Sequence, residues 1–173
     1  MCYNYIGDSM KMKNLDLKEI KIAIFDFDDT LAIHKNKDYA HIREIDEKGL
    51  DYYLKAYQNP DAFYDEIEPC FRSEALYNFI NKLRENNIKI YCLSGMRFSF
   101  HLKAKQVFVN KYYGNDIEVL STGTQELKLS GVKILQKHNN CMLDEVLFVD
   151  DRKDVIELMR NNGVKAFLVS DFK

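Results

Sequence analysis

The chain has 173 residues, of which 46% are hydrophobic and 30% are charged, and its formal net charge is −2. This length suits a single domain with a sizeable core, and the small net charge excludes a general basic surface for nucleic acid or acidic membranes. No apolar run reaches the roughly 20 residues of a membrane-spanning helix, and no secretory signal pattern opens the chain. We therefore expect a cytoplasmic protein in which residues 1–17 form a loosely held leader.

Five short apolar runs predict β-strands. Each run is too short for a helix, and the runs are nearly continuous rather than alternating, as expected of strands that are covered on both faces. They span residues 22–25, 88–93, 117–120, 145–149 and 165–169.

Three stretches between these strands carry apolar side chains at helical spacing: residues 73–86, 130–140 and 154–163. Gly163 stands where a helix commonly ends in a left-handed residue. Strands that alternate with helices indicate crossover units and a parallel sheet. The sequence therefore predicts an α/β, Rossmann-like fold, a three-layer sandwich with a central parallel sheet.

One segment, residues 34–68, interrupts this alternation. It is too long for a plain loop and too rich in Tyr, Leu and Ala for a disordered one. We interpret it as a small, mostly helical insertion after the first strand of a single domain.

Polar side chains follow the ends of the predicted strands. In open α/β sheets, ligands bind outside the carboxyl ends of the strands, so parallel neighbouring strands would bring these side chains to one edge. The groups, in chain order, are Asp26, Asp28, Asp29 and Thr30; Ser94, Gly95 and Arg97; Ser121, Thr122, Gly123 and Lys128; and Asp150, Asp151 and Asp154.

The residue types at this edge indicate a cation site beside an anion site. Carboxylates that gather away from water must be neutralised by protons or by a cation. Oxygen ligands favour Mg²⁺, which keeps some of its positions for water or phosphate oxygens. A lysine and a hydroxyl beside the metal would complete a site for a negatively charged phosphoryl group. The sequence thus predicts metal-assisted phosphoryl transfer.

These residues, in this order, resemble the four motifs of the haloacid dehalogenase (HAD) superfamily of phosphohydrolases. The first motif, D-x-D-x-T after an apolar strand, matches residues 26–30, and the second, a Ser or Thr that ends a strand, matches Ser94. The third, a lysine near the start of a helix, is best matched by Lys128, and the fourth lies in FVDDRKD at residues 148–154. The resemblance covers residues 20–170 or so and implies a HAD-like fold and an Mg²⁺-dependent phosphatase.

The resemblance implies a role for most residues of the first motif. Asp26 would be the nucleophile that forms an aspartyl-phosphate. Asp28 would be the general acid and then the general base, and its backbone carbonyl would bind Mg²⁺ beside the Asp26 carboxylate. Thr30 would brace the loop, whereas Asp29 has no implied chemical role. Family members with dehalogenase activity lack the second acid, so Asp28 argues for phosphate chemistry.

The later motifs would bind the phosphate and the metal. Ser94 would donate a hydrogen bond to a phosphoryl oxygen, with Gly95 beside it. Arg97 would contact the substrate phosphate, although a place on a helix surface explains it equally well. Lys128 would offset the charge of the nucleophile and the phosphate, and the acidic pair of the fourth motif would hold Mg²⁺ directly or through water.

Two assignments stay open. Lys133 competes with Lys128, which we favour because apolar neighbours then take the buried helix face. The direct metal ligand of the acidic pair is either Asp150 or Asp151, and we expect Asp154 to be an acid in the first turn of a helix.

The insertion and the fourth motif bear on the substrate. In the HAD family, insertions after the first motif form caps, and residues 34–68 are short for a full helical cap. A small cap suits a small phosphorylated metabolite, a nucleotide or the end of a larger molecule. The run DDRKDVIELMRNNGV is similar to the phosphatase half of polynucleotide kinase/3′-phosphatases. A strip of basic residues after Ser94 would bind a nucleic-acid end. Its members are Arg97, His101, Lys103, Lys105 and Lys111.

The alternative from another class is a non-catalytic relative that only binds phosphate or a protein partner. Every motif residue is present, which argues against it.

Overall fold

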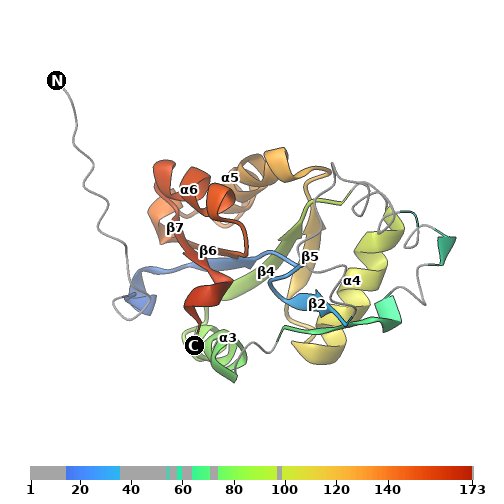
Figure 1. Cartoon of the computed structure of the whole chain (residues 1–173). Helices are drawn as coiled ribbons and strands as arrows, with labels where there is room; N and C mark the ends of the chain where they lie inside the picture. The colour runs from blue at the N-terminus through green and yellow to red at the C-terminus, as the bar shows by residue number, and fades with distance from the viewer. Residues whose placement is uncertain are drawn as a thin grey trace.

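The computed structural model describes residues 15–35, 54, 58–59, 64–70, 74–96 and 99–172. Its largest element is a parallel sheet of five strands in the order β5-β4-β1-β6-β7, so that β1 lies in the middle (Figure 1). All five predicted strands are confirmed: β1 (Ile22–Phe25), β4 (Lys89–Ser94), β5 (Glu118–Ser121), β6 (Val146–Asp150) and β7 (Lys165–Leu168).

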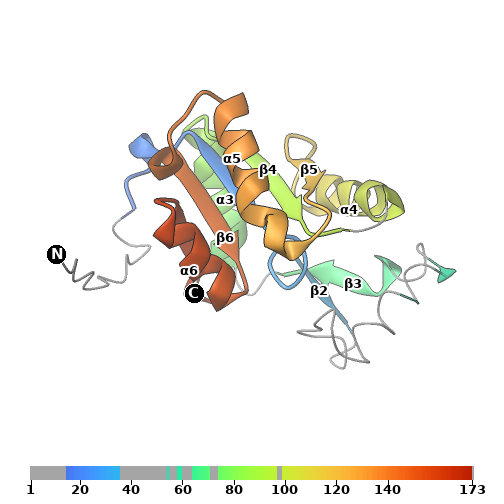
Figure 2. The same ribbon diagram turned by 90° about the horizontal axis from the view of Figure 1, so that it is seen from above.

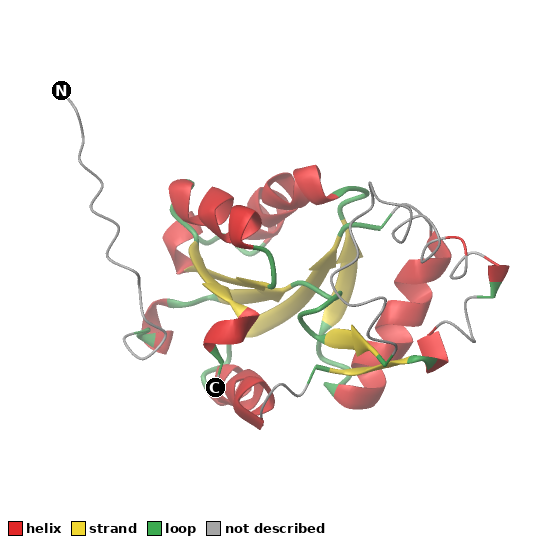
Figure 3. Cartoon of the chain, viewed as in Figure 1, coloured by secondary structure: helices red, strands yellow, loops and turns green. Residues whose placement is uncertain are grey.

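In the described part of the chain, four α-helices cover the two faces of the sheet (Figures 1 and 2). The helices α3 (Glu74–Glu85) and α4 (Ser99–Tyr112) pack on one face. The helices α5 (Lys128–His138) and α6 (Lys153–Asn161) pack on the other. The predicted three-layer sandwich is confirmed (Figure 3). Short 3-10 helices lie at Leu17–Glu19, Gln125–Leu127, Leu143–Glu145 and Val169–Asp171.

The central strand β1 is buried on both faces. Ala23 and Phe25 belong to the apolar cluster that faces α3 and α4, whereas Ile22 and Ile24 belong to the cluster that faces α5 and α6. This explains why the strand is a continuous apolar run rather than an alternating one. Within the residues that the structure describes, no helix combines the length and the apolar character that crossing a membrane requires.

The sequence pattern does not predict α4, because polar residues occupy its buried face. His101 and Lys105 are buried on this helix, while Val107 is 59% exposed. This arrangement removes the apolar stripe by which an amphipathic helix is recognised. The expected surface strip of basic residues is therefore wrong in part. Of its four described members, Lys103 and Lys111 are exposed, whereas His101 and Lys105 are buried.

The predicted insertion begins and ends in a small antiparallel sheet that the sequence pattern does not predict. The strand β2 (Ala32–His34) pairs with β3 (Ile67–Pro69). Most of the insertion, residues 36–53, 55–57 and 60–63, lies outside the described residues, and so do residues 1–14 of the expected leader. The helical character of the insertion stays a prediction.

The parallel register brings three strand ends together. The last residue of β1 pairs with Cys92 of β4 and with Val149 of β6. Asp26 follows directly, and its N–H donates to the carbonyl of Val149 at 2.9 Å. Ser94 at the end of β4 and Asp150 at the end of β6 therefore lie on either side of Asp26.

Gly131 allows α5 to approach the edge of the sheet closely. A Cβ atom at this position would lie 2.7 Å from Cγ2 of Thr122 and 3.1 Å from a methyl group of Leu93. The Thr122 hydroxyl donates to the carbonyl of Thr124 at 2.7 Å, so this side chain cannot rotate away without losing a hydrogen bond. The close approach helps to set the position of Lys128, at the start of the same helix.

We expect Gly131→Ala to lower the free energy of unfolding by about 1–3 kcal/mol, the usual cost of overpacking a filled core. This cost outweighs the gain of about 1 kcal/mol that alanine brings as the better helix former. Urea unfolding followed by circular dichroism measures the change. Ser130→Ala, on the exposed side of the same helix, is the matched control and should change by less than about 0.5 kcal/mol. A Gly131→Ala protein as stable as the wild type would show that α5 has room to move.

Candidate active site

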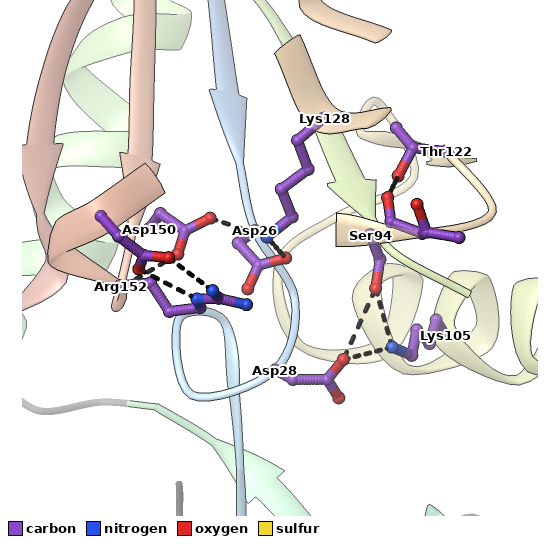
Figure 4. A network of polar contacts seen from close by, with 10 residues as sticks. Asp26, Asp28, Ser94, Lys105, Thr122, Lys128, Asp150 and Arg152 are labelled. Carbon is purple, nitrogen blue, oxygen red and sulfur yellow. Dashed lines mark hydrogen bonds and ion pairs between the residues drawn. The ribbon is translucent and has the colours of Figure 1, made fainter. Parts of the chain in front are cut away.

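The ammonium group of Lys128 lies between two carboxylates (Figure 4). Its Nζ atom is 2.8 Å from Oδ1 of Asp26 and 2.7 Å from Oδ2 of Asp150. The exposed fraction is 0% for Lys128, 2% for Asp26 and 0% for Asp150. These residues come from the start of α5 and from the ends of β1 and β6, so the fold assembles two buried ion pairs from distant parts of the chain.

Lys128 is the fixed positive charge of this cluster. Burial alone would lower its pKa, because the charged form loses its solvation. The two carboxylates outweigh this effect and raise the pKa of Lys128 above its ordinary value, so the side chain is protonated at neutral pH. Removing the lysine would leave two buried carboxylates without their counter-ion, which is strongly unfavourable.

One lysine does not neutralise the carboxylates around it. The pKa of Asp26 is raised to about 7, first by burial and then by the negative charges of Asp150 and Asp28, against the opposing effect of Lys128. Burial also raises the pKa of Asp150. The cluster therefore lacks positive charge at neutral pH when no metal is bound.

Asp151 adds a third carboxylate to the cluster. Carboxylate oxygens of Asp26, Asp150 and Asp151 all lie within 4.8 Å of one another. Burial, together with the negative charges of Asp26 and Asp29, raises the pKa of Asp151 to about 7. The donors are all oxygen atoms, and they carry more negative charge than Lys128 offsets. Their chemistry therefore fits a hard divalent cation such as Mg²⁺.

The two members of the acidic pair differ in their contacts. Both oxygens of Asp150 accept hydrogen bonds, Oδ2 from Lys128 at 2.7 Å and Oδ1 from the main-chain N–H of Arg152 at 2.9 Å. The guanidinium of Arg152 pairs with Asp154 at 2.6 Å, and Asp154 lies in the first turn of α6, as expected. Asp150 is thus held in place by the protein itself, whereas Asp151 is partly exposed.

A second group of polar contacts surrounds Ser94 (Figure 4). The Nζ atom of Lys105 donates to Oγ of Ser94 at 2.8 Å and to Oδ2 of Asp28 at 2.6 Å. Oγ of Ser94 is 3.5 Å from the same oxygen of Asp28. The Asp28 side chain is 38% exposed, so a substrate or a water molecule can reach it, in contrast to the buried Asp26.

The structure brings Lys128, and not Lys133, to the acidic cluster. The Nζ atom of Lys133 contacts Oδ1 of Asn162 at 3.4 Å instead, which joins α5 to the end of α6. Thr30 is buried, but its hydroxyl has no hydrogen-bond partner among the described residues. The main-chain N–H of Thr30 donates to the carbonyl of Phe27 at 3.3 Å, and the bracing role of Thr30 stays a prediction.

The remaining predicted substrate contacts lie after β4. Gly95 follows Ser94 directly and is buried, whereas Arg97 lies outside the described residues. The Asp28 side chain contacts Lys105 and Ser94 rather than the acidic cluster, so only its backbone carbonyl remains as the predicted metal ligand.

Sequence reasoning does not identify Lys105 as a residue of the site, because it places this lysine in a surface strip. The only feature of the sequence that points to Lys105 is its spacing from His101. Lys105 lies one helical turn after His101, and both side chains point to the interior of the protein. That signal is visible only once the helix itself is known.

The fold of the chain is similar to that of solved HAD phosphatases. A HAD family enzyme from Bacteroides thetaiotaomicron, in complex with magnesium and inorganic phosphate, gives a TM-score of 0.58 at 13% identity, over 86% of this chain and 93% of that chain. A phosphoserine phosphatase, as a phospho-aspartyl intermediate analogue, gives 0.56 at 15% identity, over 83% and 84%. A haloacid dehalogenase-like hydrolase from Streptococcus pneumoniae gives 0.57 at 11% identity, over 86% and 83%. At these identities the likeness concerns the fold, and the chain has the architecture of these solved structures.

Comparison by sequence adds nothing to this likeness, since no family model and no curated protein matches the chain.

We expect Mg²⁺ to stabilise the protein more near pH 8 than near pH 5.5. The pKa values of Asp26 and Asp151 are raised from 3.8 to about 7 in the folded protein, so the metal-free protein loses stability as the pH rises and both groups ionise. Bound Mg²⁺ offsets this loss, because it binds the ionised carboxylates. Thermal unfolding at each pH, with EDTA or with Mg²⁺ at equal ionic strength, should show a gain of several degrees in Tm at the higher pH and a smaller gain at the lower one.

In this experiment Asp151→Asn is the control for site-specific binding and should lose most of the Mg²⁺-dependent gain in Tm. An equal gain at both pH values, or an unchanged gain in Asp151→Asn, would place the binding of Mg²⁺ elsewhere.

Proposed function

We propose that this chain is an Mg²⁺-dependent phosphomonoester hydrolase that forms an aspartyl-phosphate on Asp26. The observation that carries this proposal is the ammonium group of Lys128 between Asp26 and Asp150, with Asp151 beside them. The similar folds support it, because one of these structures holds magnesium and inorganic phosphate and another is an analogue of a phospho-aspartyl intermediate.

In the first step, Asp26 attacks the phosphorus atom of the ester. Lys128 holds one oxygen of its carboxylate, which leaves the other to approach phosphorus in line with the leaving oxygen. A bond forms between this oxygen and phosphorus while the ester P–O bond breaks. The leaving oxygen takes a proton from Asp28, which acts as the general acid. Covalent capture divides one difficult reaction into two easier ones.

In the second step, Asp28 acts as the general base. It takes a proton from the water molecule that attacks phosphorus, and the bond between phosphorus and Asp26 breaks. This releases inorganic phosphate and returns the carboxylate of Asp26 and the protonated form of Asp28. The 38% exposure of the Asp28 side chain allows both the leaving group and the water to reach it. The two acids thus lie in different environments, as their different roles require.

Lys128 and the acidic pair offset the negative charge of the reaction. We propose that Asp26 and Asp151 ligate Mg²⁺ through their carboxylates, since Asp151 is partly exposed whereas Asp150 is buried and held by Lys128 and by the Arg152 main chain. The Asp26 oxygen that Lys128 contacts can also bind the metal, because a carboxylate oxygen carries two lone pairs. When bound, Mg²⁺ supplies positive charge beside the phosphoryl oxygens. Lys128 keeps its proton and stabilises the carboxylate of the nucleophile and the charge that develops on the phosphoryl group. Asp150 fixes the position of Lys128.

The substrate would enter between the strand ends and the insertion. Asp29 donates its N–H to the carbonyl of Ala32 at 2.8 Å, so the insertion starts directly beside the loop that carries Asp26. We propose that residues 34–68 act as a small cap and that Ser94 donates its hydroxyl to a phosphoryl oxygen. A small cap suits a small phosphomonoester, and no contact of the described residues favours the end of a nucleic acid.

Asp26→Asn should lower kcat for p-nitrophenyl phosphate by about 10³-fold or more, as expected for the loss of a nucleophile. Asp29→Asn is the matched control and should stay within about threefold of the wild type, because asparagine tolerates the left-handed backbone (φ 55) of this residue. Both variants are assayed with Mg²⁺ and with EDTA after their folding is checked by circular dichroism.

The enzyme proposal fails if the wild type shows no Mg²⁺-dependent turnover of p-nitrophenyl phosphate or of a panel of phosphorylated metabolites and nucleotides. The nucleophile assignment fails if Asp26→Asn retains the activity of Asp29→Asn.

A further inference from the structure

Lys105 is a buried lysine for which the proposed mechanism has no role. It lies on α4 with an exposed fraction of 5%, and its ammonium group contacts both Ser94 and Asp28. We propose that Lys105 is a positioning residue of the site, which directs the hydroxyl of Ser94 toward the phosphoryl group and holds the carboxylate of Asp28 beside it. This inference rests on the proposed phosphatase function and assigns to it a residue outside the four sequence motifs.

The direction of the Ser94 hydroxyl follows from the chemistry of the ammonium group. An ammonium group has three donors and no acceptor, so in the contact of 2.8 Å the oxygen of Ser94 must accept. The hydrogen of the hydroxyl then points elsewhere. The Asp28 oxygen at 3.5 Å is farther than the usual 2.5–3.0 Å of such a hydrogen bond. The hydroxyl therefore gives up only this long contact when it donates to a phosphoryl oxygen.

Lys105 also fixes one oxygen of Asp28. The distance of 2.6 Å between Nζ and Oδ2 of Asp28 is that of a charge-assisted hydrogen bond. On another side of the ammonium group lies the ring of Phe27, whose centroid is 4.5 Å from Nζ. Phe27 is the residue between the two motif acids, and its ring packs edge-on against Phe108 of the same helix as Lys105. Lys105 thus contacts two successive residues of the motif loop, Phe27 and Asp28.

These contacts indicate that Lys105 acts through its neighbours rather than on the substrate. Its donors face Ser94 and Asp28, and the ring of Phe27 covers a further side. A buried ammonium group is costly unless it is paired, and a lysine on the exposed face of α4 would avoid this cost, as Lys103 does. The free-energy cost of burying Lys105 is explained if its ammonium group positions Ser94 and Asp28.

The rest of the buried face of α4 supports this assignment. Nδ1 of His101 forms a hydrogen bond of 2.5 Å with the hydroxyl of Tyr64, which lies near the end of the insertion. Burial, followed by the charge of Lys105, lowers the pKa of His101 to about 4, so this imidazole is neutral at neutral pH. His101 is thus a neutral partner of Tyr64, and the ion pair that this helix makes with Asp28 is formed by Lys105.

The first test compares Lys105→Met with Lys103→Met, which removes an exposed ammonium group from the same helix. Lys105→Met should lower kcat/KM for p-nitrophenyl phosphate by about 100-fold, a loss comparable to that of one preorganised donor, whereas Lys103→Met should match the wild type. In a Ser94→Ala background, the same Lys105→Met change should cost about tenfold or less, because residues that act together are not additive. Full additivity of the two changes would overturn the inference.

A second variant separates positioning from folding. Lys105→Ala should regain activity when ethylammonium is added, and ethanol should not restore it, because the missing group is a cation that donates hydrogen bonds. A purely structural lysine would lower the Tm of the variant without any specific rescue by the amine. Equal effects of ethylammonium and ethanol would therefore overturn the inference.

Binding of inorganic phosphate in the presence of Mg²⁺, measured by calorimetry, distinguishes failure of this inference from failure of the proposed function. Lys105→Met should bind phosphate about tenfold more weakly than Lys103→Met.

If the wild type turns over p-nitrophenyl phosphate and both variants match it in rate and binding, the positioning role is wrong and the phosphatase function stands. If the wild type has no turnover, the phosphatase function is wrong. In that case equal phosphate binding by the two variants, or none by the wild type, also overturns the role of Lys105, whereas weaker binding by Lys105→Met supports it.

Discussion

A single buried ammonium group ties the candidate site to the fold. Lys128 has no exposed surface and contacts two carboxylates that are themselves buried. Unpaired charge of either sign is very unfavourable in the interior of a protein. The positions of Lys128, Asp26 and Asp150 are therefore mutually dependent. With Asp151 nearby, three carboxylates face one lysine, so the folded chain itself creates the demand for a further cation.

The parallel sheet explains how so much charge gathers at one place. The strand β1 lies in the middle of the sheet, between β4 and β6, and all three strands end at the same edge. One polar residue lies at the end of each strand, and α5 brings Lys128 to them from across the edge, helped by the absence of a side chain at Gly131. The apolar residues of β1 thus do more than fill the core, because their burial fixes the position of Asp26, which follows directly.

Much of this arrangement can be predicted from the sequence, and the exceptions have physical reasons. The five core strands are visible because burial on both faces makes each of them a continuous apolar run. The helix α4 is not visible, because Lys105 on its buried face is explained by partners that lie 11 and 77 residues away in the chain. The strands β2 and β3 are too short for a pattern, and they form only because the ends of the insertion meet.

The acidic pair of the fourth motif is likewise only partly predictable from the sequence. Spacing alone identifies the pair Asp150 and Asp151 but does not separate their roles, since both follow the same strand. Their contacts do distinguish them: Asp150 is committed to Lys128 and to the Arg152 main chain, whereas Asp151 is partly exposed. The choice between Lys128 and Lys133 likewise depends on how α5 packs against the sheet, which no local pattern of residues determines.

A crystal structure of the protein with Mg²⁺ and beryllofluoride tests the central claim most directly. The account predicts a bond between beryllium and a carboxylate oxygen of Asp26, with Mg²⁺ ligated by Asp26 and Asp151 and with Lys128 still between Asp26 and Asp150. Beryllofluoride bound away from Asp26 while Mg²⁺ is present would contradict it.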